Sequence, residues 1–125
     1  MKLQGKVVSG VGNFSYWIAK LEDHYHRKTG MHFFPGTLNV QLERPYSLPA
    51  DVIRLEGEEY GGTVSVSMVP CRILGKSGFI LRTDANEQER GHHPKTVVEV
   101  ACEVKLRDYF RLSDGDQVEI EIQEE

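Results

Sequence analysis

Short segments in which apolar and polar residues alternate recur along the whole chain, and glycine or proline separates most of them. Alternation with a period of two is typical of a strand that buries one face, because successive side chains of a strand point to opposite sides of the sheet. Segments of this kind, with few helical stretches between them, predict a mainly β fold and favour a small closed or partly closed barrel. We expect strands at residues 5–9, 14–19, 37–42, 52–56, 63–74, 78–82, 96–102 and 118–122.

Two hairpins are expected where glycine-containing segments separate neighbouring strands. Gly10-Val11-Gly12-Asn13 joins the first two expected strands, and Gly75-Lys76-Ser77-Gly78 joins the strands at 63–74 and 78–82. Glycine is common in such connections because it adopts backbone angles that other residues avoid.

The remaining connections include two short helices and one polar loop. Residues 20–29 have a helical pattern with acidic residues early, basic residues late and Gly30 as the expected C-cap. Residues 104–110 are long enough for one or two helical turns, and Asp114-Gly115-Asp116 is expected to form the turn before the last strand. Residues 84–95 are polar and aperiodic, and we expect this loop to become ordered over a ligand.

Composition indicates a globular protein that forms one domain over residues 1–125, with 39% hydrophobic residues, 27% charged residues and a net charge of −4. The 15 basic residues are scattered among 19 acidic ones, which argues against a nucleic-acid partner. No apolar run approaches the ~20 residues that span a bilayer, and no apolar signal core is evident near the start. We therefore expect a monomer in the cytoplasm without a membrane partner, in which Cys71 and Cys102 are reduced, buried thiols.

Thr37 and Asn39 form the first candidate site. They follow the turn-forming pair Pro35-Gly36 and lie two residues apart in a segment whose alternate residues are apolar. Two residues of a strand span roughly 6.6 Å and point the same way, so the hydroxyl and the amide can converge on one Mg²⁺ that also binds the phosphates of a nucleotide. The alternative is an ordinary half-buried strand whose polar residues face water.

Glu99 is the second candidate, because it lies within the apolar segment 96–101 and is expected to be buried. A buried, ionised carboxylate without a partner is costly. It could serve as a general base, or it could pair with Arg82, Arg107 or a lysine at the end of the barrel.

Five segments occur in one fixed order and together resemble the archaeal CTP-dependent riboflavin kinases over nearly the whole chain. The resemblance implies a six-stranded cradle-loop barrel of Greek-key type that transfers the γ-phosphate of CTP to the ribityl 5′-hydroxyl of riboflavin, giving FMN and CDP. The segments are Gly5-Lys6-Val7-Val8-Ser9-Gly10-Val11-Gly12, Phe34-Pro35-Gly36-Thr37-Leu38-Asn39-Val40, Val98-Glu99-Val100-Ala101, Lys105-Leu106-Arg107 and Leu112-Ser113-Asp114-Gly115-Asp116.

The resemblance also implies roles for individual residues. Thr37 and Asn39 correspond to the Mg²⁺ ligands, and Glu99 corresponds to the catalytic residue that meets the acceptor hydroxyl. His93 and Glu99 correspond to flavin contacts, although His93 could equally be a surface histidine. The implied nucleotide contacts are Val11, Gly12, Asn13, Phe14, Ser15 and Tyr16 in a glycine-rich loop, and Lys105, Leu106, Arg107 and Asp108 in a second segment.

The chain departs from the family pattern in the glycine-rich loop. The family usually has Gly-Glu-Gly followed by a basic or small residue, whereas this chain has Gly12-Asn13-Phe14-Ser15. Phe14 is expected to change the shape of the loop, since glycine lets backbone N–H groups approach phosphate closely. The choice of nucleotide therefore stays open, since a rearranged loop could favour another base than cytosine. The altered loop also leaves open a barrel that binds flavin or nucleotide without transferring phosphate. A barrel that acts through protein contacts is a third alternative.

Overall fold

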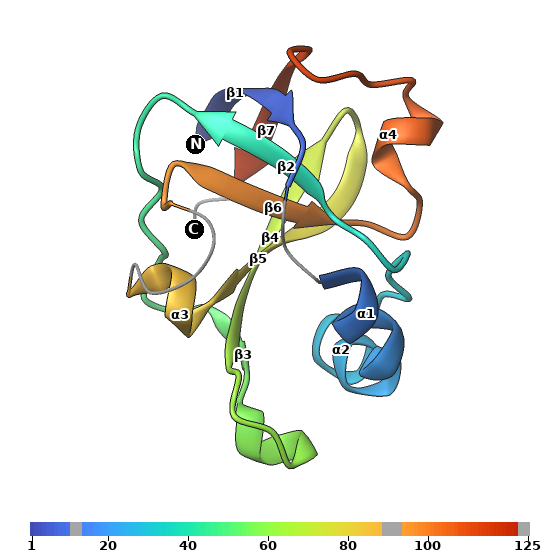
Figure 1. Cartoon of the computed structure of the whole chain (residues 1–125), viewed down its shortest axis with the longest axis vertical. Coiled ribbons are helices and arrows are strands. Elements are labelled where there is room, and N and C mark those ends of the chain that lie inside the picture. The colour runs from blue at the N-terminus through green and yellow to red at the C-terminus, as the bar shows by residue number, and fades with distance from the viewer. Residues whose placement is uncertain (11–13, 89–93, 123–125) are drawn as a thin grey trace.

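The computed structural model describes residues 1–10, 14–88 and 94–122, and the strands among them form a single antiparallel sheet (Figure 1). The strands follow the order β3-β4-β5-β6-β2-β1-β7 across the sheet. Their bounds are Lys2–Val8 for β1, Leu38–Leu42 for β2, Ile53–Leu55 for β3, Val66–Ile73 for β4, Lys76–Thr83 for β5, Val97–Ala101 for β6 and Gln117–Ile122 for β7.

The sheet closes because β4 also pairs with β7. One edge of β4 pairs with β3 at Val66–Met68 and with β7 at Cys71–Ile73, while its other edge pairs with β5 along its full length. Within the described ranges, six strands thus form the barrel and β3 extends the sheet beside it. The predicted mainly β fold with a small six-stranded barrel is confirmed.

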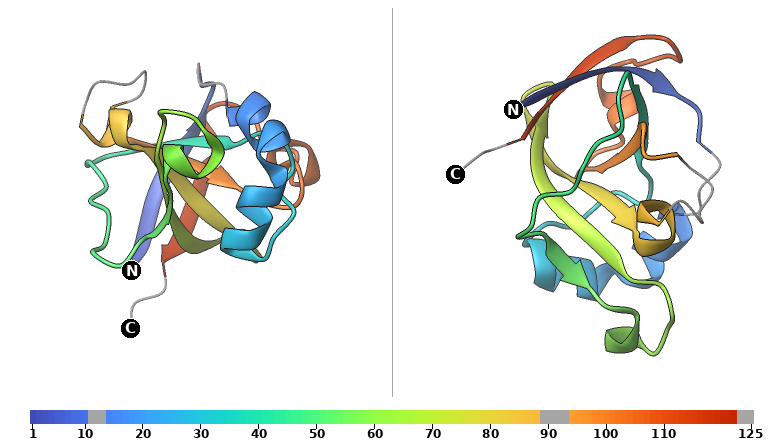
Figure 2. Two further views of the ribbon diagram at one scale, coloured as in Figure 1. Left: turned by 90° about the horizontal axis from the view of Figure 1, so that it is seen from below. Right: turned by 90° about the vertical axis from the view of Figure 1, so that its left-hand side faces the viewer.

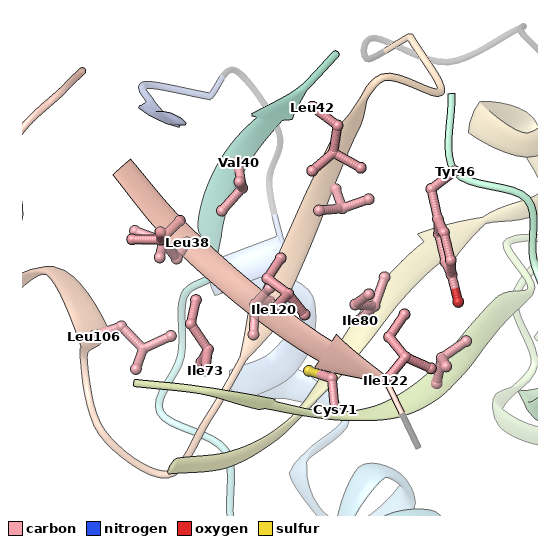
Figure 3. Close-up of a cluster of buried hydrophobic side chains, with 14 of the residues drawn as sticks. Leu38, Val40, Leu42, Tyr46, Cys71, Ile73, Ile80, Leu106, Ile120 and Ile122 are labelled. Carbon is pink, nitrogen blue, oxygen red and sulfur yellow. The ribbon is translucent and has the colours of Figure 1, made fainter. Parts of the chain in front are cut away.

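The barrel interior holds the main hydrophobic core, and alternation explains how the strands supply it. In β7, Val118, Ile120 and Ile122 are buried while the residues between them are exposed. Figure 3 shows side chains from β2, β4, β5 and β7 meeting inside the barrel. Cys71 and Cys102 belong to this core as free thiols, as predicted. Burial raises the pKa of Cys71 to about 12 and that of Cys102 to about 11.

The helices lie outside the barrel (Figure 1). Their bounds are Phe14–Lys20 for α1, Glu22–Thr29 for α2, Asp84–Glu87 for α3 and Leu106–Tyr109 for α4, with a 3₁₀ helix, η1, at Gly57–Tyr60. In Figure 2, α1 and α2 lie against one side of the barrel. The helices predicted at 20–29 and 104–110 are confirmed, and Gly30 ends α2 with the left-handed φ of 77°. None of the helices in the described part of the chain has the length and apolar content to cross a membrane.

The strand predicted at 14–19 is wrong, because these residues form α1. Phe14 and Ile18 lie four residues apart and are buried on the same face of the helix. They pack with Tyr25 of α2 and with Phe79 and Leu81 of β5 in a second core outside the barrel. The hairpin predicted between residues 5–9 and 14–19 is therefore also wrong, and β1 pairs instead with β2 and β7.

The second predicted hairpin, between β4 and β5, is confirmed, but its predicted turn at Gly75-Lys76-Ser77-Gly78 is wrong, because residues 76–78 are paired in β5. Ile73 pairs with Lys76, so the turn consists only of Leu74 and Gly75, both with positive φ (51° and 81°). This conformation fits the twist of a two-residue hairpin. The predicted polar loop begins with α3, and residues 89–93 lie outside the described residues. Its ordering over a ligand stays a prediction.

Candidate active site

Thr37, Asn39 and Glu99 lie together where β2 pairs with β6. Asn39 is directly opposite Glu99 in the antiparallel register, so the two side chains share one face of the sheet. The Thr37 hydroxyl donates a 2.8 Å hydrogen bond to Glu99 Oε1. The two candidates found separately in the sequence therefore form one cluster.

Glu99 is buried, with only 4% of its surface exposed, as predicted. Its neighbours Val98 and Val100 face the barrel interior, so Glu99 lies on the outer face of the barrel wall. All five residues of β6 are buried because the second core covers part of that outer face, including Ala101. The Glu99 carboxylate is therefore buried on the outer face of the barrel wall and lies outside the main core.

The suggested ion pairs of Glu99 with Arg82 and Arg107 are wrong, since both arginines take other partners among the described residues. Arg82 donates to the carbonyl oxygens of Tyr46 and Lys95 and pairs with Glu87 at 3.2 Å. Arg107 pairs with Asp114 at 2.8 Å. The contact of Glu99 with Thr37 instead links the carboxylate to the segment that follows Pro35-Gly36.

Asn39 has a buried side-chain oxygen, Oδ1, with no hydrogen-bond partner among the described residues. Its amide lies against Gly10, which follows β1. A Cβ atom added to Gly10 would lie 2.4 Å from Asn39 Nδ2 and 2.5 Å from Oδ1. With the Asn39 amide in this position, only glycine fits the close approach. From the sequence, Gly10 was expected only to give the backbone freedom in a hairpin connection, and its packing against Asn39 was not predicted.

The oxygens of this cluster are suitable ligands for Mg²⁺, which prefers hard oxygen donors. Thr37 Oγ1 can donate its proton to Glu99 and still offer its lone pairs to a cation. Asn39 Oδ1 has an unused acceptor position in the described structure. The described residues contain no group of three or more His, Cys, Asp or Glu side chains that could hold a metal by themselves. An ion here would need water or phosphate oxygens to complete its coordination.

A pocket of about 210 Å³ adjoins Thr37. One wall consists of residues 34–38 and the other of Val100 with residues 104–107. The backbone N–H of Phe34 donates to Cys102 O at 2.8 Å and joins the two walls. Lys105, Leu106 and Arg107 line the pocket as a result, whereas Asp108 lies outside the lining and pairs with Lys105 at 3.6 Å.

The predicted glycine-rich loop is only partly visible. Val11, Gly12 and Asn13 lie outside the described residues, as does His93. Phe14, Ser15 and Tyr16 form the first turn of α1, which corrects the expectation that they continue an open loop. Phe14 is buried in the second core, while Ser15 and Tyr16 are exposed. Nucleotide contacts by this segment stay a prediction.

Comparison with known proteins gives one family for nearly the whole chain. The model of the family CTP-dep_RFKase, described as "Domain of unknown function DUF120", matches residues 7–122. A riboflavin kinase of Pyrobaculum aerophilum is 38% identical, and the alignment covers 98% of this chain and 60% of that protein. A riboflavin kinase of Methanocella arvoryzae is 33% identical over 97% of this chain and 56% of that protein. The chain therefore spans less than two thirds of the length of these curated relatives.

Proposed function

Because the chain belongs to the CTP-dependent riboflavin kinase family, as its sequence motifs predict, we propose that it transfers the γ-phosphate of CTP to the ribityl 5′-hydroxyl of riboflavin, giving FMN and CDP. The observation that carries this proposal is the convergence of Thr37, Asn39 and Glu99 beside the pocket that Lys105 and Arg107 line. Phosphoryl transfer requires few reacting protein groups, because positioning and electrostatic stabilisation supply most of the catalysis.

In this proposal, Thr37 Oγ1 and Asn39 Oδ1 hold Mg²⁺. The ion, when bound, neutralises negative charge on the phosphates. The hydrogen bond from Thr37 to Glu99 orients the hydroxyl so that its lone pairs remain available. Gly10 keeps the Asn39 amide in position, because any larger residue would overlap it.

Glu99 is proposed to receive the 5′-hydroxyl of riboflavin. Its carboxylate accepts a hydrogen bond from Thr37 at 2.8 Å, and a carboxylate can accept several hydrogen bonds at once. Accepting the hydroxyl proton during transfer would make Glu99 the general base. His93 is the second proposed flavin contact, as the family resemblance implies.

The nucleotide is proposed to occupy the pocket beside Thr37. Lys105 and Arg107 bring positive charge to its wall, while Val100, Val104 and Leu106 add apolar surface. A base packed on that apolar surface would direct its phosphates toward the cations and Thr37. The family name supports CTP as the donor.

Product analysis tests the proposal. Purified protein is incubated with riboflavin, Mg²⁺ and CTP, with ATP, GTP and UTP in parallel, and FMN is separated from riboflavin by chromatography. FMN formation with CTP is the expected result. If no nucleotide yields FMN, the kinase proposal is wrong, and quenching of riboflavin fluorescence in the same sample would then favour a non-catalytic flavin-binding barrel.

A further inference from the structure

The carboxylate of Asp114 joins two segments that meet at the proposed nucleotide site. Its Oδ1 accepts a hydrogen bond from Arg107 Nη2 at 2.8 Å, and its Oδ2 accepts one from Ser9 Oγ at 2.7 Å. Arg107 belongs to α4, and Ser9 follows β1. Asp114 lies in the segment Leu112-Ser113-Asp114-Gly115-Asp116, none of whose residues takes part in the proposed phosphoryl transfer.

Backbone contacts hold the turn that carries Asp114 without help from its side chain. The N–H of Gly115 donates to Val7 O at 2.8 Å, and the N–H of Val7 donates to Asp116 O at 2.9 Å. Within the turn, the Asp116 carboxylate accepts from the N–H of Ser113 at 2.8 Å. The Asp114 carboxylate is therefore available to bind side chains of other segments.

The Arg107 contact bears on the pocket directly. Arg107 lines the pocket with Thr37 and also donates to Val8 O at 3.4 Å. A free arginine side chain samples many rotamers, and fixing it beforehand reduces the entropy lost when it binds an anion. Arg107 Nη2 makes both contacts, so its other N–H groups remain able to face phosphate oxygens.

The Ser9 contact bears on the proposed metal site. Ser9 directly precedes Gly10, which packs against the Asn39 amide at distances that exclude a side chain. Holding the Ser9 hydroxyl thus fixes the end of β1 over Asn39. The Ser9 hydrogen bond, followed by that of Arg107, holds the pKa of Asp114 below its ordinary value.

We propose that Asp114 is a positioning residue for the nucleotide, which orients Arg107 in the pocket wall and holds the Ser9–Gly10 segment against Asn39. This inference rests on the proposed function, since it assumes that the pocket binds a nucleoside triphosphate with Mg²⁺. Asp114 touches neither substrate in this account. It acts through Arg107 and through the end of β1.

The test compares Asp114→Ala and Asp114→Asn with the native protein. Calorimetry measures the Kd of CTP with Mg²⁺, and steady-state kinetics separates the KM for CTP, the KM for riboflavin and kcat. Asp114→Ala is expected to raise the Kd and KM for CTP about tenfold and to leave the KM for riboflavin unchanged. Asp114→Asn, which keeps one acceptor oxygen, is expected to have an intermediate effect.

Glu119→Ala is the matched control. Glu119 is an exposed carboxylate on β7 that also makes two contacts, with Lys2 at 3.6 Å and with Gln4. Both partners lie in the half of β1 that is far from Ser9. Loss of the Glu119 carboxylate is expected to leave nucleotide binding unchanged. Thermal unfolding of both variants shows whether the two substitutions differ in their effect on the fold.

A double-mutant cycle with Arg107→Ala tests whether Asp114 acts through Arg107. The combined variant is expected to bind CTP less than tenfold more weakly than Arg107→Ala alone. Two results would overturn the positioning role and leave the proposed function standing. In the first, the effects of the two substitutions on the Kd for CTP are fully additive. In the second, the native protein binds CTP and Asp114→Ala binds it with the same Kd. If the native protein binds no nucleotide, the proposed function fails, and the role of Asp114 fails with it.

Discussion

Thr37→Val removes one hydroxyl group and keeps the β-branched shape of the side chain. In the native protein this hydroxyl donates a 2.8 Å hydrogen bond to Oε1 of Glu99, whose surface is only 4% exposed. It is also one of the two oxygens proposed to hold Mg²⁺. The substitution should therefore affect the orientation of Glu99 and the affinity for the ion together.

The size of the effect follows from that hydrogen bond. A hydrogen bond to a charged group contributes about 1.5–3 kcal/mol, and each 1.36 kcal/mol corresponds to a factor of ten. Losing it should lower kcat/KM by roughly 10- to 150-fold. The concentration of Mg²⁺ needed for half-maximal rate should also rise, because one proposed ligand is lost.

Initial rates of FMN formation over a range of Mg²⁺ concentrations measure both effects. Riboflavin binding, followed by flavin fluorescence, should remain because Glu99 is still present. Thr63→Val is the control, since Thr63 is exposed and lies outside the cluster. Native kcat/KM and native Mg²⁺ dependence in Thr37→Val would refute the assignment of this hydroxyl to the site.

Three further predictions concern other parts of the molecule. Gly10→Ala places a methyl group within 2.4 Å of the Asn39 amide and should raise the half-saturating Mg²⁺ concentration about tenfold or more, measured by titration of the rate; an unchanged value would contradict the close packing. Glu99→Gln keeps the size of the side chain but removes its basicity, so kcat should fall about a hundredfold with little change in the KM for CTP; a kcat near the native value would limit Glu99 to positioning. Burial raises the pKa of Cys71 to about 12, whereas an unfolded thiol ionises near 9.0, so its contribution to the free energy of unfolding is complete below pH 9 and declines as the pH rises from 9 toward 12. Denaturant unfolding of native protein and Cys71→Val should therefore diverge in pH dependence above pH 9, and parallel curves would argue against burial of the thiol.

Strand positions could be predicted from sequence where one face of a strand is buried and the other is exposed. In β2 and β7 the buried residues alternate strictly with less buried ones, so local pattern was sufficient. The strand prediction for residues 14–19 was wrong because aromatic and apolar side chains also suit a helix whose buried residues lie four apart. Phe14 and Ile18 are buried by α2 and β5, and that packing cannot be known from the segment alone.

The candidate site shows the same division between local and distant information. The common orientation of Thr37 and Asn39 depends only on strand alternation and could be predicted. The pairing of Asn39 with Glu99 depends on the register between β2 and β6, two strands that lie far apart in the chain. The contact between Arg107 and Asp114 spans only seven residues of the chain, but it depends on the conformation of the segment between α4 and β7. The residue pattern of a single strand or helix specifies neither contact.

Quantifying FMN and CDP in one reaction tests the central proposal most directly. The native protein, incubated with riboflavin, CTP and Mg²⁺, should form the two products in equal amounts, and excess chelator should stop both. An Asn39→Leu variant should form neither product at a comparable rate. If CDP accumulates without FMN, or if FMN forms equally well in the presence of chelator, the proposed magnesium-dependent transfer to riboflavin is contradicted.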